Sequence, residues 1–301
     1  MGLAKQMARF VIREAKHSSI HGSVLLIGRQ TVHLTAAQFS GLMREEGLTI
    51  DPAIPVTLDT RTRAGAGRSF ISDAYLFKAL GADSVTAIDV SDYEGAEIVH
   101  NLDTPIPATL EGRFDFICNG SVLDNMFNPV AGLHNISRML KPGGRVIHFE
   151  HASNATNNAY LQFSPNWFFD YFVVNRFADC KAYLALFSDL YGSWDFYACL
   201  YDGAKEPRQV RSARFAMTCV VAEKAVGSTW DASPVQGQYR SAADQTIYRE
   251  CLQEFHKSTR PILSANANLP QIRFAIMPLL SRLYASIFPR ERGYLRLGKF
   301  Y

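Results

Sequence analysis

Short apolar runs alternate with helix-like segments over the first half of the chain. The runs lie at residues 23–28, 85–88, 98–100, 114–118 and 145–149. Each is too short for a helix and is nearly continuous in apolar residues, which is typical of a buried parallel strand. Segments with helical spacing separate them, notably residues 35–46, where Thr35 is a suitable N-cap, and residues 72–80. This alternation predicts an α/β fold, a doubly wound parallel sheet covered by helices.

The N-terminal segment and one insertion do not follow this alternation of strands and helices. Residues 1–21 form an amphipathic helix with basic residues between its apolar positions. It packs on the edge of the domain or, alternatively, lies on a membrane surface. Within the main domain, residues 22–224, we interpret residues 47–70 as an insertion or mobile loop because they are rich in Pro, Gly, Thr and Arg. A short strand is expected there at residues 55–58.

The pattern changes after residue 149. Residues 160–191 contain many aromatic residues and are expected to form an aromatic cap, and strand-like runs follow at 194–201 and 214–222. A polar linker begins the last part of the chain, residues 225–301, which continues as a helical C-terminal extension with a basic end. The basic extension suits peripheral contact with anionic lipid, homodimer formation or packing on the domain.

Composition narrows the function class. The 301 residues are 48% hydrophobic and 20% charged, which is typical of a globular chain. A net charge of +3 gives no argument for nucleic-acid binding. The five cysteines are scattered without C-x-x-C spacing, so we expect free thiols in a reducing compartment. No apolar run reaches the length of a membrane span and charged residues interrupt the N-terminus, so we expect a cytoplasmic protein without a secretory signal.

Two features between residues 84 and 154 indicate chemistry. Asp89 ends a predicted strand, where open α/β sheets place ligand contacts, and a carboxylate there can accept both hydroxyls of a ribose. Lys141 begins a Lys-Pro-Gly-Gly turn between a helix and a strand, which supports the fold and has no chemistry of its own.

These segments resemble the core of class I S-adenosylmethionine (SAM)-dependent methyltransferases. The resemblance implies a Rossmann-like methyltransferase sheet whose last strands are antiparallel, and S-adenosyl-L-methionine as cofactor. A further likeness, Tyr160-Leu161-Gln162-Phe163-Ser164-Pro165, is to methyltransferases encoded among bacterial cell-surface glycan genes. The chain departs from the family in its first loop, where a Gly-x-Gly-x-Gly pattern is reduced to Gly28.

The resemblance assigns cofactor contacts to the strand-end loops. Side chains at the other two glycine positions would crowd the approach of the cofactor, unless the loop takes another path or Gln30 and Thr31 supply hydrogen bonds themselves. Asn101 lies where related enzymes have an Asp that binds the adenine amine. The full set of expected cofactor-binding residues is Gly28, Gln30, Thr31, Asp89, Val90, Ser91, Tyr93, Asn101, Leu102, Asn119 and Gly120.

Two residues are candidates for the catalytic base. His151, at the end of the last parallel strand, has a side-chain type suited to proton removal near neutrality. Asp124 keeps a carboxylate where family members often have Glu-His, although it could instead cap the next helix. The run from His148 to His151 does not favour a metal site, because alternate residues of a strand face opposite ways.

The acceptor is expected to contact the segment after His151. Tyr160, Gln162 and Asn166 are the candidate substrate-binding residues, because an aromatic ring can stack on a sugar and the amides can bind hydroxyls. The sequence therefore predicts methyl transfer to a hydroxyl, or less readily an amine, of a small polar acceptor such as a sugar or glycan precursor. A catalytically degenerate, methyltransferase-like binding or scaffold protein is the alternative, and a different α/β enzyme with a nucleotide-type cofactor is the third reading.

Overall fold

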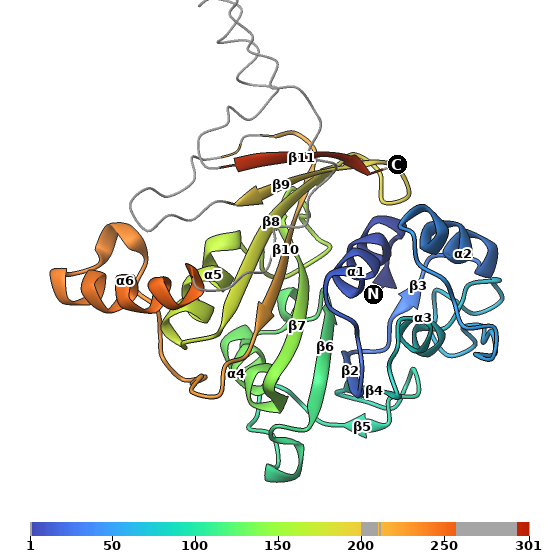
Figure 1. Cartoon of the computed structure of the whole chain (residues 1–301), viewed down its shortest axis with the longest axis horizontal. Coiled ribbons are helices and arrows are strands. Elements are labelled where there is room, and N and C mark those ends of the chain that lie inside the picture. The colour runs from blue at the N-terminus through green and yellow to red at the C-terminus, as the bar shows by residue number, and fades with distance from the viewer. Residues whose placement is uncertain (1, 200–209, 211, 257–293, 301) are drawn as a thin grey trace, which may run out of the picture.

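A nine-stranded mixed sheet forms the centre of the molecule (Figure 1). The computed structural model describes residues 2–199, 210, 212–256 and 294–300. The strand order in this part is β11-β9-β8-β10-β7-β6-β2-β4-β5. The bounds are β2 Ser23–Ile27, β4 Ser84–Asp89, β5 Ile98–Val99, β6 Phe114–Gly120, β7 Leu140–Ser153, β8 Asp179–Phe187, β9 Trp194–Cys199, β10 Phe215–Glu223 and β11 Tyr294–Phe300.

The sheet has a parallel half and an antiparallel half. Strands β5, β4, β2, β6 and β7 pair in parallel, whereas β10, β8, β9 and β11 pair antiparallel. The parallel strands bring the residues that follow Ile27, Asp89, Val99 and Gly120 to one edge of the sheet. The predicted doubly wound α/β fold with antiparallel last strands is confirmed.

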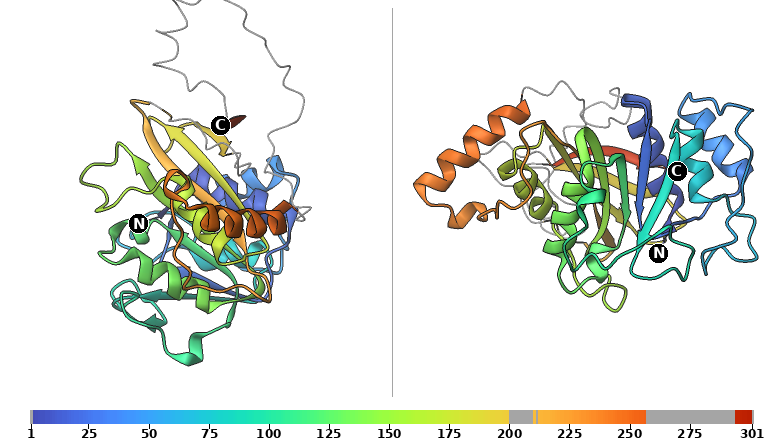
Figure 2. Two further views of the ribbon diagram at one scale, coloured as in Figure 1. Left: turned by 90° about the vertical axis from the view of Figure 1, so that its left-hand side faces the viewer. Right: turned by 90° about the horizontal axis from the view of Figure 1, so that it is seen from below.

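Helices cover both faces of the sheet (Figure 2). On one face lie α1 (Lys5–His17), α2 (Ala36–Glu45) and α3 (Asp73–Ala79), and on the other lie α4 (Pro129–Met139), α5 (Pro165–Val174) and α6 (Ala242–His256). Each face has its own cluster of buried apolar side chains. Thr35 caps α2 as expected, because its side chain accepts from Gln38 N and its own N–H donates to the Gln38 side chain.

Helix α1 is part of the domain core. Phe10 is 1% exposed, and its ring centroid lies 5.5 Å from that of Phe149, 5.2 Å from Tyr183 and 5.9 Å from Phe196. Arg145 also binds Glu14 through an ion pair of 2.5 Å. The apolar side of α1 therefore faces the sheet, which supports packing on the domain and not a membrane-surface role.

A small second sheet joins the N-terminus to the loop that follows β2. Strand β1 (Gly2–Leu3) pairs in parallel with β3 (Thr31–Val32). These two-residue strands have no recognisable pattern in the sequence, and we did not predict them.

Three predictions for segments outside the parallel strands need correction. The aromatic segment forms no separate cap, because its residues build α5 and β8. Phe168, Phe169 and Phe172 are buried, which confirms the expectation that these three rings belong to the core. The expected strand at residues 55–58 is only an isolated bridge between Leu58 and Ile71. The extension is helical in α6, but its end is strand β11, so Arg296 and Lys299 lie on a strand and not on a basic helix. Residues 257–293 lie outside the described part.

The polar linker packs against α5. Thr229 N donates to Asn175 O at 2.9 Å and Ala232 N donates to Asn175 Oδ1 at 3.0 Å. Tyr171 Oη also donates to Trp230 O at 2.8 Å.

Among the described residues, no helix is long and apolar enough to cross a bilayer. All five cysteines are buried and stand outside any disulfide.

Candidate active site

The first loop turns sharply at the end of β2. Gly28 has φ of +70°, a conformation that glycine adopts without strain, and its N–H donates to Ile88 O at 2.8 Å. A Cβ at this position would lie 3.5 Å from Asp89 Oδ2 and 3.4 Å from Val122 Cγ2. Gly28 therefore brings the backbone of β2 close to the acid at the end of β4 and to the loop after β6.

Gln30 fills the space between the ends of β2 and β6. Its side chain is fully buried, and Nε2 donates to Ile27 O at 2.9 Å and to Gly28 O at 3.2 Å. A Cβ on Gly120 would lie 2.2 Å from Gln30 Oε1, so only glycine fits beside this amide. Gln30 Oε1 is buried without a hydrogen-bond partner within the described residues. An acceptor in that state indicates that a donor is missing from the site.

Two of the side chains expected to contact the cofactor face the protein interior and must be corrected. Thr31 Oγ1 donates to Thr62 Oγ1 at 2.6 Å and is buried, so its hydroxyl holds the insertion and not a ligand. Asn119 is buried; its Nδ2 lies 2.9 Å from His148 Nδ1 and donates to Glu150 Oε1 at 2.5 Å. The Leu102 side chain also lies in the apolar core, which leaves open the contact expected of it, a hydrogen bond from its backbone amide to the adenine. Their strand-end positions do not make these side chains ligands.

The loops after β4 and β5 expose the other expected contacts. Asp89 Oδ1 accepts from Val90 N at 2.7 Å, and His100 N donates to Asp89 O at 2.8 Å. Asn101 is exposed, and its Oδ1 accepts from Asp103 N at 2.9 Å. The exposed members of these loops surround the end of β4: Val90, Ser91, Tyr93 and Asn101.

The structure joins the two candidate bases. His151 Nδ1 lies 2.6 Å from Asp124 Oδ2, and His151 N donates to the same oxygen at 3.0 Å. Asp124 is fully buried, whereas the His151 side chain is 20% exposed. Burial raises the pKa of Asp124, but hydrogen bonds from His151 and Ser121 outweigh it and hold the pKa below its ordinary value.

An ionised carboxylate can only accept hydrogen bonds. His151 Nδ1 must therefore carry its hydrogen, which leaves a lone pair on Nε2. This arrangement orients the imidazole as a proton acceptor on the exposed side. The alternative role of Asp124, as an N-cap of the next helix, is wrong, because the Asn128 side chain caps α4.

Ser121 is a member of the site that sequence reasoning missed. Its Oγ donates to Asp124 Oδ2 at 2.5 Å and lies 3.1 Å from His151 Nδ1. Its φ of +67° is unusual for a residue with a side chain. Its position directly after β6 was the only signal in the sequence. Asn125 Nδ2 holds the other carboxylate oxygen, donating to Asp124 Oδ1 at 2.7 Å.

A buried polar layer lies beneath this pair. Glu150 is fully buried and accepts from Leu123 N at 3.3 Å and from Asp124 N at 3.1 Å, which fixes the turn that carries Asp124. Burial, followed by the charge of Asp124, raises the pKa of Glu150 well above its ordinary value. Burial lowers the pKa of His148 to about 3, so this imidazole is neutral. Within the described residues, no three His, Cys, Asp or Glu side chains are grouped to hold a metal ion.

The segment expected to bind the acceptor is attached to Asp124. Tyr160 N and Leu161 N donate to Asp124 O at 2.8 and 3.0 Å. The Tyr160 ring is 69% exposed, and its centroid lies 5.0 Å from that of Phe127, which is 86% exposed. Phe127 was not predicted. Gln162 is exposed, and Asn166 is partly buried and accepts a hydrogen bond from Ser164 Oγ.

The chain is similar over part of its length to methyltransferases. Residues 63–148 match the family described as methyltransferase domain. This match includes Asp89 and Asp124 and leaves out Gly28 and His151. No curated protein matches the chain.

Solved structures give weaker similarities. The CMeT domain of the citrinin polyketide synthase has 12% identity and a TM-score of 0.40, over 73% of this chain and 52% of that one. A SAM-dependent methyltransferase of Thermotoga maritima has 14% identity and a TM-score of 0.35, over 73% and 90% of the chains. The 1,6-didemethyltoxoflavin-N1-methyltransferase of Burkholderia thailandensis has 14% identity and a TM-score of 0.39, over 74% and 78%. The chain thus spans about half the length of the solved CMeT-domain chain, and these similarities are too weak to transfer a substrate. The direct match to methyltransferases is the one over residues 63–148.

Proposed function

We propose that this protein is a SAM-dependent methyltransferase that methylates a hydroxyl, or less readily an amine, of a small polar acceptor such as a sugar or glycan precursor. The observation that carries the proposal is the pairing of His151 with Asp124 at 2.6 Å, on the same sheet edge as Asp89. The family match over residues 63–148 supports the reaction type. The exposed ring of Tyr160 supports an acceptor with a flat apolar face.

The strand-end residues fit the cofactor. Asp89 keeps one carboxylate oxygen without a hydrogen bond among the described residues, and this oxygen suits a ribose hydroxyl. Gln30 Oε1 needs a donor, and the ammonium of the methionine moiety would supply one. When bound, S-adenosylmethionine offers a methyl group on a positively charged sulfur. Asn101 retains a second lone pair on Oδ1 for the adenine amine.

His151 would remove the acceptor's proton. Its Nε2 is the proton acceptor because Asp124 holds Nδ1 in the protonated form. As the proton moves to Nε2, the Asp124 carboxylate stabilises the imidazolium that forms. Tyr160 and Phe127 would hold a ring of the acceptor beside His151, with Gln162 and Asn166 as hydrogen-bonding partners, so orientation supplies part of the rate acceleration.

One observation favours the second candidate, a methyltransferase-like binding protein without catalysis. Gln30 occupies the space that glycines leave open in the family's first loop, and Thr31 and Asn119 face inward. A cofactor that requires that space would bind weakly or not at all.

Calorimetric titration with SAM and with S-adenosylhomocysteine separates the two candidates. Binding is expected, and Asp89→Ala should weaken it by about tenfold to a hundredfold, because hydrogen bonds to a charged group are lost. Asp92→Ala, at an exposed acid of the same loop, is the matched control and should leave the affinity unchanged. Failure of both ligands to bind would exclude the enzyme, and equal effects of the two variants would refute the pocket.

A further inference from the structure

A second cavity lies away from the candidate active site. It has a volume of about 350 Å³ and lies between residues 54–61 of the insertion, helix α3 and the outer edge of β4. Cavities of this size hold small molecules. Gly28, Asp89 and His151 do not line it, so it is separate from the residues that we assign to methyl transfer.

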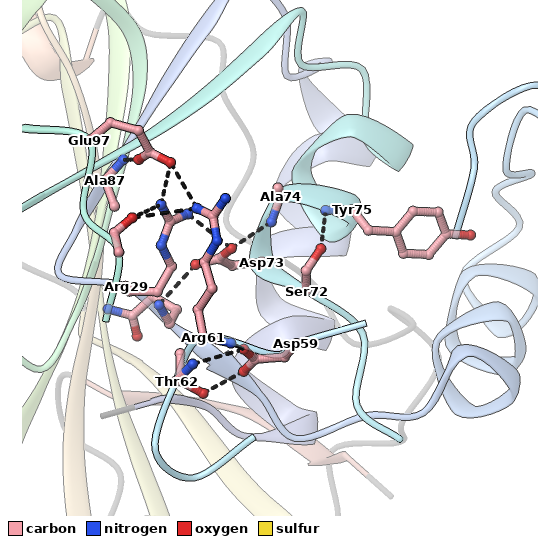
Figure 3. A network of polar contacts seen from close by, with 12 residues as sticks. Arg29, Asp59, Arg61, Thr62, Ser72, Asp73, Ala74, Tyr75, Ala87 and Glu97 are labelled. Carbon is pink, nitrogen blue, oxygen red and sulfur yellow. Dashed lines mark hydrogen bonds and ion pairs between the residues drawn. The ribbon is translucent and has the colours of Figure 1, made fainter. Parts of the chain in front are cut away.

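Six charged side chains line the cavity, and its three carboxylates already have their donors (Figure 3). Asp73 accepts from Arg29 at 3.3 Å, Ala74 N at 2.7 Å and Gln30 N at 3.0 Å. Glu97 accepts from Arg29 at 2.5 Å, Arg61 at 3.1 Å and Ala87 N at 2.7 Å.

The third carboxylate, Asp59, is equally engaged. It accepts from Arg61 N at 3.1 Å and Thr62 N at 3.0 Å, and also from Thr62 Oγ1. Each carboxylate thus has three donors from the protein. Little acceptor capacity is left for a cationic ligand.

The three cations keep donors that the protein does not use. The Arg29 side chain is 4% exposed, and its Nε is buried without a partner among the described residues. Arg61 is 57% exposed and uses only NH1 in its bonds to Glu97 and to Gly95 O. Lys78 is exposed and makes no hydrogen bond or ion pair within the described structure. Arg61 and Lys78 therefore present unused donors at the cavity, and Arg29 adds a buried positive charge to its lining.

We propose that this cavity is a binding site for a small organic anion that carries a phosphate or carboxylate group. Arg61 and Lys78 contact the anion from the insertion and from α3, and the buried guanidinium of Arg29 attracts it through its charge. Guanidinium groups suit both anions because their N–H groups match two oxygens at once. The site is distinct from the methyl acceptor and from the cofactor, so the proposal goes beyond the proposed function.

Inorganic phosphate and malonate are the probes, titrated into the full chain at constant ionic strength with chloride as the balancing ion. The first readout is the NMR signal of the Arg29 Nε–H, which should shift on saturation with at least one probe. The probe with the lower Kd then shows whether the site prefers a phosphate or a carboxylate group.

Calorimetry gives the second readout. Arg61→Gln and Lys78→Gln, both at exposed positions, should each weaken that probe about tenfold, since each removes a charge-assisted hydrogen bond. Arg63→Gln is the matched control, because Arg63 is exposed on the same loop and does not line the cavity.

Three outcomes would overturn the proposal. An unshifted Arg29 signal while an anion binds would mean an adventitious ion only. An equal loss of affinity in Arg63→Gln would assign the binding to the general charge of the loop. Displacement of the probe by S-adenosylhomocysteine would assign the cavity to the cofactor site.

Discussion

Replacing Asp124 with asparagine tests whether its charge orients the candidate base. The asparagine side chain has the same shape, but its NH₂ group can point at His151 Nδ1. In the unmodified protein this nitrogen lies 2.6 Å from an oxygen of the Asp124 carboxylate. Nδ1 would then have to accept, and the hydrogen would move to Nε2, where it blocks proton removal. Even with the amide oxygen toward Nδ1, the charge that stabilises the imidazolium is lost.

The expected loss follows from the contribution of general base catalysis, about 10²- to 10⁴-fold. We expect kcat of Asp124→Asn to fall within that range, with the Kd of S-adenosylhomocysteine changed less than about twofold, since Asp124 contacts no proposed cofactor residue. An acceptor is first identified by the mass gain of one methyl group. Release of S-adenosylhomocysteine then gives kcat. Asp103→Asn, at an exposed acid, is the control.

His151→Gln should lower kcat to a similar extent, and the double variant should be no slower than the slower single variant. This non-additivity is expected when two residues act as one unit. Full activity of both single variants would refute the base assignment. A loss of cofactor affinity that matches the loss of kcat would assign the pair a structural role.

Three further predictions concern stability. Because the pKa of Glu150 is raised above 4.5, the folded protein keeps the Glu150 proton at pH values where the unfolded chain has lost it, and the contribution of Glu150 to stability falls as pH rises above about 4.5. In Glu150→Gln this fall in unfolding free energy with pH should be absent from urea unfolding measured between pH 4 and 8. An unchanged fall in the variant would contradict a neutral Glu150 carboxyl. Phe10→Ala should cost about 3–5 kcal/mol of unfolding free energy, whereas Lys5→Ala should cost little; equal costs would mean that α1 is not a core element. Gly120→Ala should lower the free energy of unfolding by about 1–3 kcal/mol, because the new Cβ would meet the Gln30 amide. This loss should be smaller when Gln30 is also replaced with alanine. Additive losses of the two substitutions in thermal unfolding would contradict the contact.

The parallel half of the sheet could be predicted because its strands are continuous apolar runs. Residues 23–28 and 114–118 have this pattern, and both form strands in the structure. Strand β8 escaped prediction because its two aromatic residues, Tyr183 and Phe187, continue an aromatic-rich run that begins in helix α5, and composition does not separate the helix from the strand. Strands β1 and β3 contain two residues each, and only their contact with each other defines them.

The candidate site was predictable only residue by residue. Asp124 and His151 were each proposed as a base, but their contact joins two strand ends 27 positions apart, and no local pattern encodes it. The side chains of Thr31 and Asn119 face the interior for a similar reason. Each contacts a residue that is distant in the sequence, Thr62 for Thr31 and His148 for Asn119. Strand-end position predicts which edge a residue occupies and does not predict which way its side chain faces.

The place of β10 in the sheet has a consequence for synthesis. This strand, Phe215–Glu223, lies between β7 and β8, although it follows both in the chain. Until it emerges from the ribosome, β7 and β8 each have an open edge, and edges of this kind pair readily with other chains. The buried contacts of Phe10 with Tyr183 of β8 and Phe196 of β9 also form only after these strands dock on the sheet. Nascent chains that stall or are cut before residue 223 are therefore expected to aggregate, and a truncation intended to isolate the parallel half should keep β10.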